Sequence, residues 1–156
     1  MQSSSSIRHW AIVSLIAGTL AVSGFFIPWF IVIDISLGGF YGSGAQFVVN
    51  TFVALLQGEV FLIIVLVALL LLLLLALVPL GAGLLRLAGK EESWLERMQV
   101  GGAIAGLVLM GLSVAFLDFL LASLFSRATI IPGVGVGLMA VGLVLALVAG
   151  IGTRRA

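Results

Sequence analysis

The chain of 156 residues contains no cysteine and a single histidine. Without thiols it can form no disulfide, thiolate nucleophile, iron–sulfur cluster or zinc–thiolate site. Charge is also scarce: 8% of the residues are charged, against about 25% in an ordinary soluble domain. The net charge is +1. The basic residues follow or precede apolar runs rather than forming a basic stripe, so we expect no nucleic-acid partner.

Groups that carry out chemistry are missing as well. The sequence shows no acid pair, no Ser-His-Asp set, no metal-ligand spacing and no phosphate-binding loop, since residues 133–137 lack the lysine of a P-loop. His9 could ligate a haem or chlorophyll magnesium, but a lone imidazole beside Trp10 fits an anchor at the membrane edge better. An enzyme inside the membrane needs polar groups within the bundle. We therefore predict no catalytic, cofactor-binding or metal site, and no enzymatic activity.

Long apolar runs fill the chain instead, which is 63% hydrophobic. Four runs without charge reach the roughly 20 residues that a helix needs to cross about 30 Å of hydrocarbon. They cover residues 10–33, 60–85, 98–117 and 128–153. The length of the first favours a retained helix over a cleaved secretory signal. Residues 1–6 are typical of a disordered tail.

The fold that we predict is an all-α, four-helix transmembrane bundle with a small extracellular cap. A single transmembrane domain covers residues 1–156. Its spans are expected at about 10–30, 59–85, 98–124 and 132–152, with an outer loop at 31–58.

The basic residues indicate how the chain sits in the membrane. Six of the seven follow or precede the apolar runs on one side, and only Arg127 lies on the other. By the positive-inside rule, both termini are expected in the cytoplasm, and the protein in the plasma or inner membrane. Trp10 and Trp29 lie at the two ends of the first helix, about 28 Å apart along its axis, which is close to the hydrocarbon thickness. Trp94 lies in the cytoplasmic loop. We predict all three as interface anchors; the alternative is that they are core residues.

The outer loop carries the pattern of a β-hairpin. Pro28 should end the first helix, and the apolar/polar alternation from Ile33 is typical of a half-buried strand. Gly38-Gly39 then signals a turn, after which Phe40-Tyr41 starts a return strand.

A short amphipathic helix is predicted next. Ser43-Gly44-Ala45-Gln46 matches a capping box. Gln46, Asn50 and Gln57 share one face and apolar residues occupy the rest, so the helix is amphipathic and too short to span. We expect it in the outer interface or over the mouth of the bundle. The alternative is an outward extension of the second span, although Gly58-Glu59 favours a break.

Small residues mark where the spans should pack. In lipid they let helix backbones approach closely, where packing replaces the hydrophobic effect. The second span, nearly pure leucine and valine, should be the most lipid-exposed, and Pro79 should kink or end it. The third carries two small-residue faces, which predicts a neighbour on each. We assign these stripes to packing within the bundle first and to self-association second. The predicted packing residues are Gly102, Gly106, Gly111, Ala115, Gly135, Gly142, Ala146 and Gly150.

Asp118 is the one acid in the interior of a predicted span. At the bilayer centre an Asp costs roughly 2.5–3.5 kcal/mol on insertion scales, which makes Asp118 a candidate ion or polar site. Because it lies in the outer third of its span, we favour an interfacial acid that meets Arg127 or water. The alternative is that it binds a proton or cation at the mouth of a pore.

The segment Ile27-Pro28-Trp29-Phe30, followed by an extended loop and Ser43-Gly44, resembles small prokaryotic four-helix membrane proteins of unassigned function. In topology the chain is also similar to the claudin and peripheral-myelin-protein group, tetraspans with cytoplasmic termini and a β-containing first loop. The Gly-Leu-Trp motif and two cysteines of the claudin loop are missing here. No functional residue is carried over from either group.

These features predict a non-enzymatic integral membrane protein. We expect a structural or accessory subunit whose partners are the lipid bilayer and either itself or a larger membrane complex. The alternative is a homo-oligomeric pore or small transporter with its outer mouth near Asp118, which needs a polar path between helices.

Overall fold

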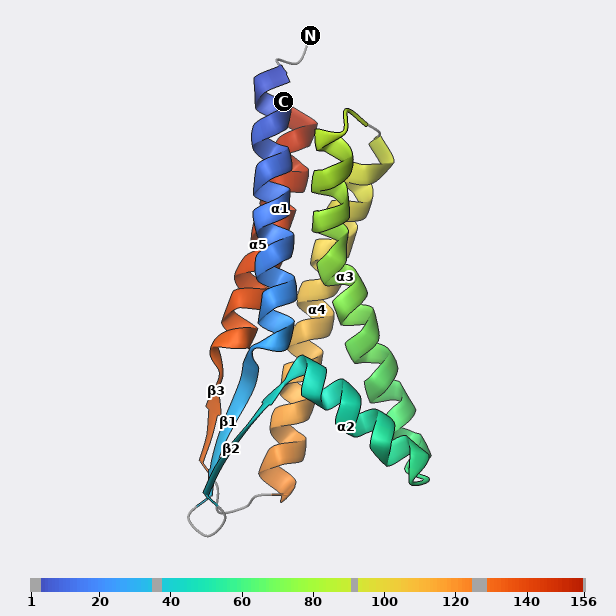
Figure 1. The fold of residues 1–156 in the computed structure, drawn as a ribbon, viewed down its shortest axis with the longest axis vertical. Coiled ribbons are helices and arrows are strands. Elements are labelled where there is room, and N and C mark those ends of the chain that lie inside the picture. The colour runs from blue at the N-terminus through green and yellow to red at the C-terminus, as the bar shows by residue number, and fades with distance from the viewer. Residues whose placement is uncertain (1–3, 35–37, 91–92, 125–128, 156) are drawn as a thin grey trace.

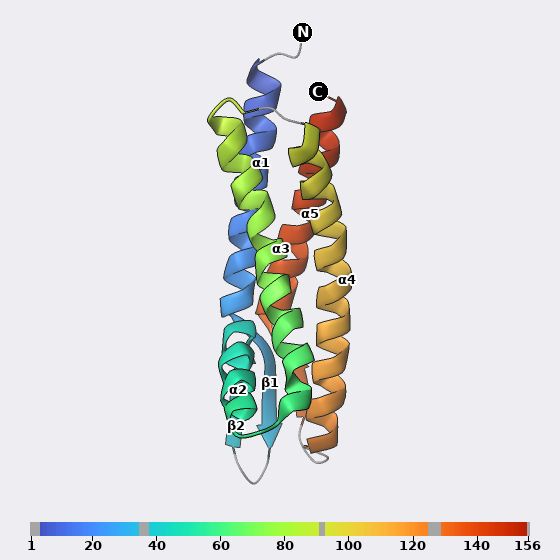
Figure 2. The same ribbon diagram turned by 90° about the vertical axis from the view of Figure 1, so that its right-hand side faces the viewer.

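The computed structural model describes residues 4–34, 38–90, 93–124 and 129–155. Four helices of membrane-spanning length and hydropathy pack together: α1 (Ser4–Phe26), α3 (Ile63–Leu87), α4 (Ser93–Leu124) and α5 (Val134–Arg155). Both ends of the chain lie at one end of this bundle, here called the terminal end (Figures 1 and 2). A small sheet and the short helix α2 (Gly44–Leu56) lie at the other, the sheet end. The predicted four-helix membrane bundle with a small cap is confirmed.

Two helices begin earlier than predicted. α1 starts at Ser4, so residues 4–6 are helical rather than a disordered tail, while residues 1–3 lie outside the described chain. α4 starts at Ser93, so Trp94 lies in the first turn of a helix and not in a loop. Glu96 in that turn interacts favourably with the positive end of the helix dipole, which helps the helix to begin before its apolar run.

Pro79 does not end the second span, because α3 continues through it to Leu87. A proline removes one hydrogen bond of the helix, and membrane helices tolerate this where neighbouring groups satisfy the freed backbone. Pro79 is buried. The half of α3 nearer the sheet end diverges from α1 (Figure 1).

The closest packing joins α1 to α5. A Cβ atom on Gly142 would lie 2.5 Å from the backbone nitrogen of Ala21 and 2.6 Å from the carbonyl oxygen of Ala17. One on Gly24 would lie 2.6 Å from the carbonyl oxygen of Gly135. Glycine thus lets the two backbones meet directly. In keeping with this, 39% of an 18-residue window is buried in the α1 and α5 spans, against 22% in those of α3 and α4, so α3 is no more exposed than α4.

A three-stranded antiparallel sheet extends the bundle at the sheet end. Its middle strand, β1 (Pro28–Asp34), pairs with β2 (Gly38–Ser43) and β3 (Thr129–Pro132). The β1–β2 pair is the predicted hairpin, although Gly38 and Gly39 pair within β2 instead of forming the turn.

The third strand, β3, was not predicted. Pro132 was expected to open the last helix, but it ends β3 opposite Phe30, and α5 begins at Val134. β3 is an edge strand, where a residue without an N–H is tolerated.

Strand β1 is half-buried, but the face turned to the core is the opposite of the one that the alternation of isoleucines indicated. The face that packs on the core carries Phe30 and Val32, while Ile31 and Ile33 are 40% and 47% exposed. The Phe30 ring stands edge-on to Phe47 of α2 at a centroid distance of 6.4 Å. Contact with α2 therefore explains why the phenylalanine side of the strand is the buried one.

The capping box of α2 is confirmed. The Gln46 N–H donates to Ser43 Oγ at 3.3 Å, and the Ser43 N–H donates to Gln46 Oε1 at 3.0 Å. Gly58 has a φ of 99° and, with the 3₁₀ turn at Val60–Leu62, separates α2 from α3. The alternative in which this segment simply extends the second span is wrong.

α2 presents two adjacent stripes to its surroundings. One is polar, and beside it lies an apolar stripe in which Leu56 is 74% exposed. A helix with this pair of stripes suits the plane of a membrane surface. The exposed side chains are Gln46, Asn50 and Gln57 on the polar stripe and Val49, Phe52, Val53 and Leu56 on the apolar one.

The α1–α5 contact can be tested with two substitutions on the same helix. We expect Gly142→Leu to destabilise the protein by roughly 3 kcal/mol, because the new side chain meets fixed backbone. Gly137→Leu should change stability little, since a Cβ there meets nothing within 4 Å. Thermal unfolding in detergent, followed by circular dichroism, measures both. Equal stability of the two variants would contradict the described packing.

Candidate functional site

A buried polar cluster links all four membrane helices near the terminal end. Arg86 of α3 donates through Nη1 to Ser14 Oγ of α1 at 3.0 Å and to Gln99 Oε1 of α4 at 2.6 Å. Gln99 Nε2 donates to Ser14 Oγ at 3.0 Å and to the carbonyl oxygen of Ala146 in α5 at 2.9 Å. The Ser14 hydroxyl itself donates to the carbonyl oxygen of Trp10 at 2.9 Å. One hydroxyl thus uses its donor and both acceptor positions.

The cluster is shielded from its surroundings. Ser14 and Gln99 are fully buried and Arg86 is 6% exposed. A charged side chain inside a membrane bundle is expensive and marks a candidate functional site by default. Here the hydrogen bonds from Arg86 offset part of that cost. These hydrogen bonds also restrict rotation of α1, α3 and α4 about their axes, because each of these helices contributes one of the three side chains.

Sequence reasoning missed this cluster. Arg86 counted only as a basic residue at a helix end, and Gln99 was given no role. A signal existed, since Gln99 is a neutral polar residue at the start of an apolar run, two residues after Arg97. Spacing along the chain could not show that it meets a residue of the preceding helix.

Asp118 lies well away from this cluster. On α4 it is nearer the sheet end than Gln99 by about 28 Å, at 1.5 Å per helical residue. It is exposed and lines an open lateral pocket of about 370 Å³, here called the α4–sheet pocket, together with Gly111, Ala115 and Pro132. Its predicted partner Arg127 lies outside the described residues, so the ion pair stays a prediction.

The predicted packing residues divide into two groups. Six lie between helices, where Gly106 faces Leu143 and Gly150 faces Val100. The six are Gly102, Gly106, Gly135, Gly142, Ala146 and Gly150. The other two, Gly111 and Ala115, point out of the bundle, and a Cβ on Gly111 would meet nothing within 4 Å. Only one of the two small-residue faces of α4 therefore meets neighbouring helices of this chain.

The three tryptophans occupy different environments. Trp94 is 45% exposed at the start of α4, and Trp10 is half-buried beside Gly152. Trp29 is fully buried: its Nε1 donates to the carbonyl oxygen of Gly24 at 2.9 Å and its ring stands edge-on to Phe25. Trp29 is a core residue, which is the alternative that the sequence left open.

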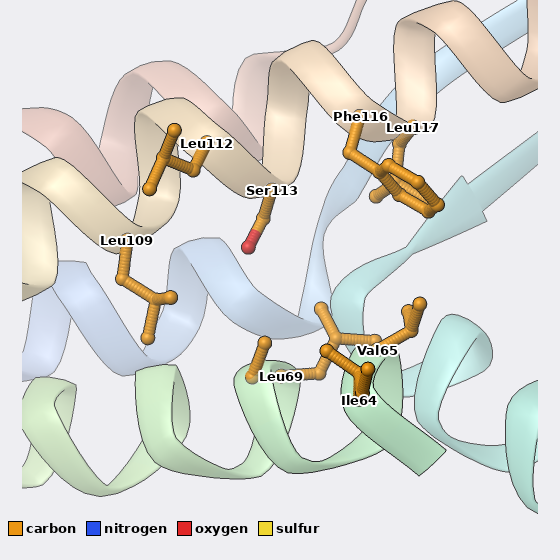
Figure 3. Close-up of a pocket in the computed structure, with 9 residues that line it drawn as sticks. Ile64, Val65, Leu69, Leu109, Leu112, Ser113, Phe116 and Leu117 are labelled. Atoms are coloured by element: carbon orange, nitrogen blue, oxygen red, sulfur yellow. The ribbon is translucent and has the colours of Figure 1, made fainter. Parts of the chain in front are cut away.

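A second lateral cavity, the α3–α4 groove, opens between these two helices and has a volume of about 420 Å³ (Figure 3). The Ser113 hydroxyl points into the gap and is the one polar group among the described lining side chains. The lining residues are Ile64, Val65, Ala68 and Leu69 of α3 and Leu109, Leu112, Ser113, Phe116 and Leu117 of α4.

In the described part of the chain, no three His, Asp or Glu side chains lie close enough together to hold a metal ion. The chain matches no protein-family model, no curated protein and no solved structure in the comparisons made. The four long apolar helices are consistent with a small tetraspan membrane protein.

Removal of Gln99 tests the polar cluster. We expect Gln99→Leu to destabilise the protein by roughly 3 kcal/mol, because a buried charged group loses a hydrogen bond. Arg86→Met added to Gln99→Leu should recover part of this loss, since the buried charge is then gone as well. Gln57→Leu, at an exposed glutamine, is the matched control and should stay within about 0.5 kcal/mol. Chemical unfolding in detergent gives the values; a Gln99→Leu protein as stable as its control would contradict the structural role.

Proposed function

We propose that this protein is a non-enzymatic structural or accessory subunit of a membrane complex, and that it acts by packing the outward face of α4 against a partner helix. The observation that carries the proposal is the open position at Gly111. No neighbour within the described chain approaches the place where its side chain would be.

Small residues continue along this outward face. Ala115 and Ala122 are exposed on the same side of α4 as Gly111. A glycine inside a helix costs about 1 kcal/mol relative to alanine, and a purely lipid-facing position offers no packing in return. Within this chain, glycines in α1 and α5 allow the backbones of these two helices to come into direct contact.

The shape of the surface beside these small residues also supports contact with a partner helix. The α4–sheet pocket hollows the surface next to Gly111 and Ala115 and is bounded on its other side by Ile130 and Pro132 of β3. A partner helix seated there would contact α4 closely and touch the sheet. The partner is either a second copy of the chain or another membrane subunit.

We also propose that the terminal end faces the cytoplasm. Arg8, Lys90 and Arg97 lie at this end of the bundle, which agrees with the positive-inside rule. The sheet and α2 then lie on the outer side.

A homo-oligomeric pore is the second candidate, and the position of Asp118 favours it. Asp118 lies on the same outward side of α4 as Gly111, so a ring of copies packed through this stripe would bring the carboxylates together. The core of the single chain is apolar between Asp118 and the polar cluster, with Leu72, Met139 and Leu143 fully buried. A conducting path would therefore run between copies and not through one bundle.

The packing role is tested by the mass of the intact particle extracted gently from its native membrane. We expect a mass above that of one chain, and the same mass for Gly81→Leu, a substitution at an equally open glycine of α3. Gly111→Leu should release the partner, because a leucine at the contact keeps the backbones apart. A monomer in the unaltered protein would overturn the proposal, and so would a complex that survives Gly111→Leu.

The pore alternative makes a separate prediction. In reconstituted vesicles it requires ion flux above that of empty vesicles, and Asp118→Asn should then alter ion selectivity, because the ring of carboxylates loses its charge. Under the packing role we expect no flux from either protein. Flux in the unaltered protein that Asp118→Asn changes would replace the packing role with the pore.

A further inference from the structure

We propose that the α3–α4 groove binds the acyl chain of one phospholipid from the leaflet on the sheet side of the membrane. This site goes beyond the packing role and does not depend on it, because the groove lies on a different side of α4 from Gly111.

The groove lies at the depth of one leaflet. Trp94, Glu96 and Arg97 place the membrane boundary near the start of α4, just before Gln99. From Gln99, the groove residues Leu109 to Leu117 are about 15 to 27 Å away along the helix axis. In a hydrocarbon layer of about 30 Å this is the half nearer the sheet.

The chemistry of the walls selects a hydrocarbon occupant. Eight of the nine lining residues are apolar. An ordered water needs two to four polar partners, and the Ser113 hydroxyl alone does not provide them. An empty groove would forfeit the dispersion contacts of every side chain that lines it. The groove opens sideways onto surface that already faces lipid, since Ile64 is 75% and Leu112 is 63% exposed.

The size of the wall residues favours a thin chain over a helix. A helix with its side chains is about 10 Å across, and close approach of its backbone needs glycine or alanine on the opposing surface. The α3–α4 groove offers Ala68 and Ser113, and its remaining walls are bulky leucine, isoleucine, valine and phenylalanine. The α4–sheet pocket also has bulky walls, among them Trp29 and Phe30, but on the exposed face of α4 it presents glycine and alanine, Gly111 and Ala115.

Polar residues lie where the head group of such a lipid would be. Gln57 and Glu59 are exposed in the turn that leads into α3, a few residues before Ile64 at the outer end of the groove. At the level where the hydrocarbon ends, the Gln57 amide can donate to a phosphate oxygen, and the Glu59 carboxylate can attract the cationic group of a zwitterionic head group.

The test uses the full-length protein in phosphatidylcholine vesicles that contain a phospholipid with a photoreactive diazirine midway along one acyl chain. After irradiation, peptide mass spectrometry locates the labelled residues. We expect labelling of the groove residues of α3 and α4 to exceed severalfold the labelling of Leu74, which is 61% exposed on the opposite side of α3.

Filling the groove supplies the decisive comparison. Ala68→Trp should lower labelling of the α4 wall to the level of Leu74, and Leu112→Ala, which widens the opening, should not. If Ala68→Trp does not fold, as judged by gel filtration and helical content, Ser113→Leu fills the groove with a smaller change. Leu70→Trp, outside the lining residues, is the matched control and should leave labelling unchanged.

Two results would overturn the proposal. Labelling spread evenly over all exposed apolar residues would mean ordinary contact with bulk lipid. Absence of labelling in the groove of the intact particle, with labelling restored once the particle is dissociated into single chains, would mean that a protein segment occupies it.

Discussion

Close contact between the backbones of α1 and its neighbours governs the rest of this structure. In lipid the helices gain nothing from leaving water, so their association rests on how tightly they pack. Gly24 and Gly142 bring α1 and α5 together, and Gly83 brings α3 against the carbonyl oxygen of Ala11. With α1 held from two sides, its Ser14 hydroxyl lies within reach of both Arg86 and Gln99. The polar cluster is thus a consequence of the glycine contacts as much as a support for them.

The surface of α4 has three sides with different side chains and different neighbours. One side packs against α3 and α5 through Gly102 and Gly106. A second, with Gly111 and Ala115, is small and open, while a third forms the wall of the α3–α4 groove with large apolar side chains. On α4 itself, side-chain size separates the second surface from the third, and the carboxylate of Asp118 makes the second the more polar of the two. Size is therefore the property that separates a helix partner from a lipid chain in our proposals.

The sequence predicted what depends on local pattern and missed what depends on distant residues. The charge-free runs predicted the four spans, and the capping box of Ser43 and Gln46 predicted the start of α2. β3 was missed because four residues carry too little alternation and its partner lies about a hundred residues earlier. Gly106 and Gly111 give the same signal in sequence, yet one is in contact and the other is open, because only the arrangement of helices decides which way each points.

The pairing of β3 with β1 has a consequence for how the molecule is made. β1 follows the first membrane helix and β3 precedes the last. The middle strand, β1, therefore cannot pair with β3 until nearly the whole chain has been synthesised. Until then β1 keeps one edge of unpaired backbone groups, which can pair with another chain. The third strand therefore joins the sheet late in synthesis, and it connects the segment after α1 to the segment between α4 and α5. Completion of the sheet therefore requires that β1 and β3 lie on the same side of the membrane, which depends on the insertion of the helices between them, α3 and α4, and not on that of α5.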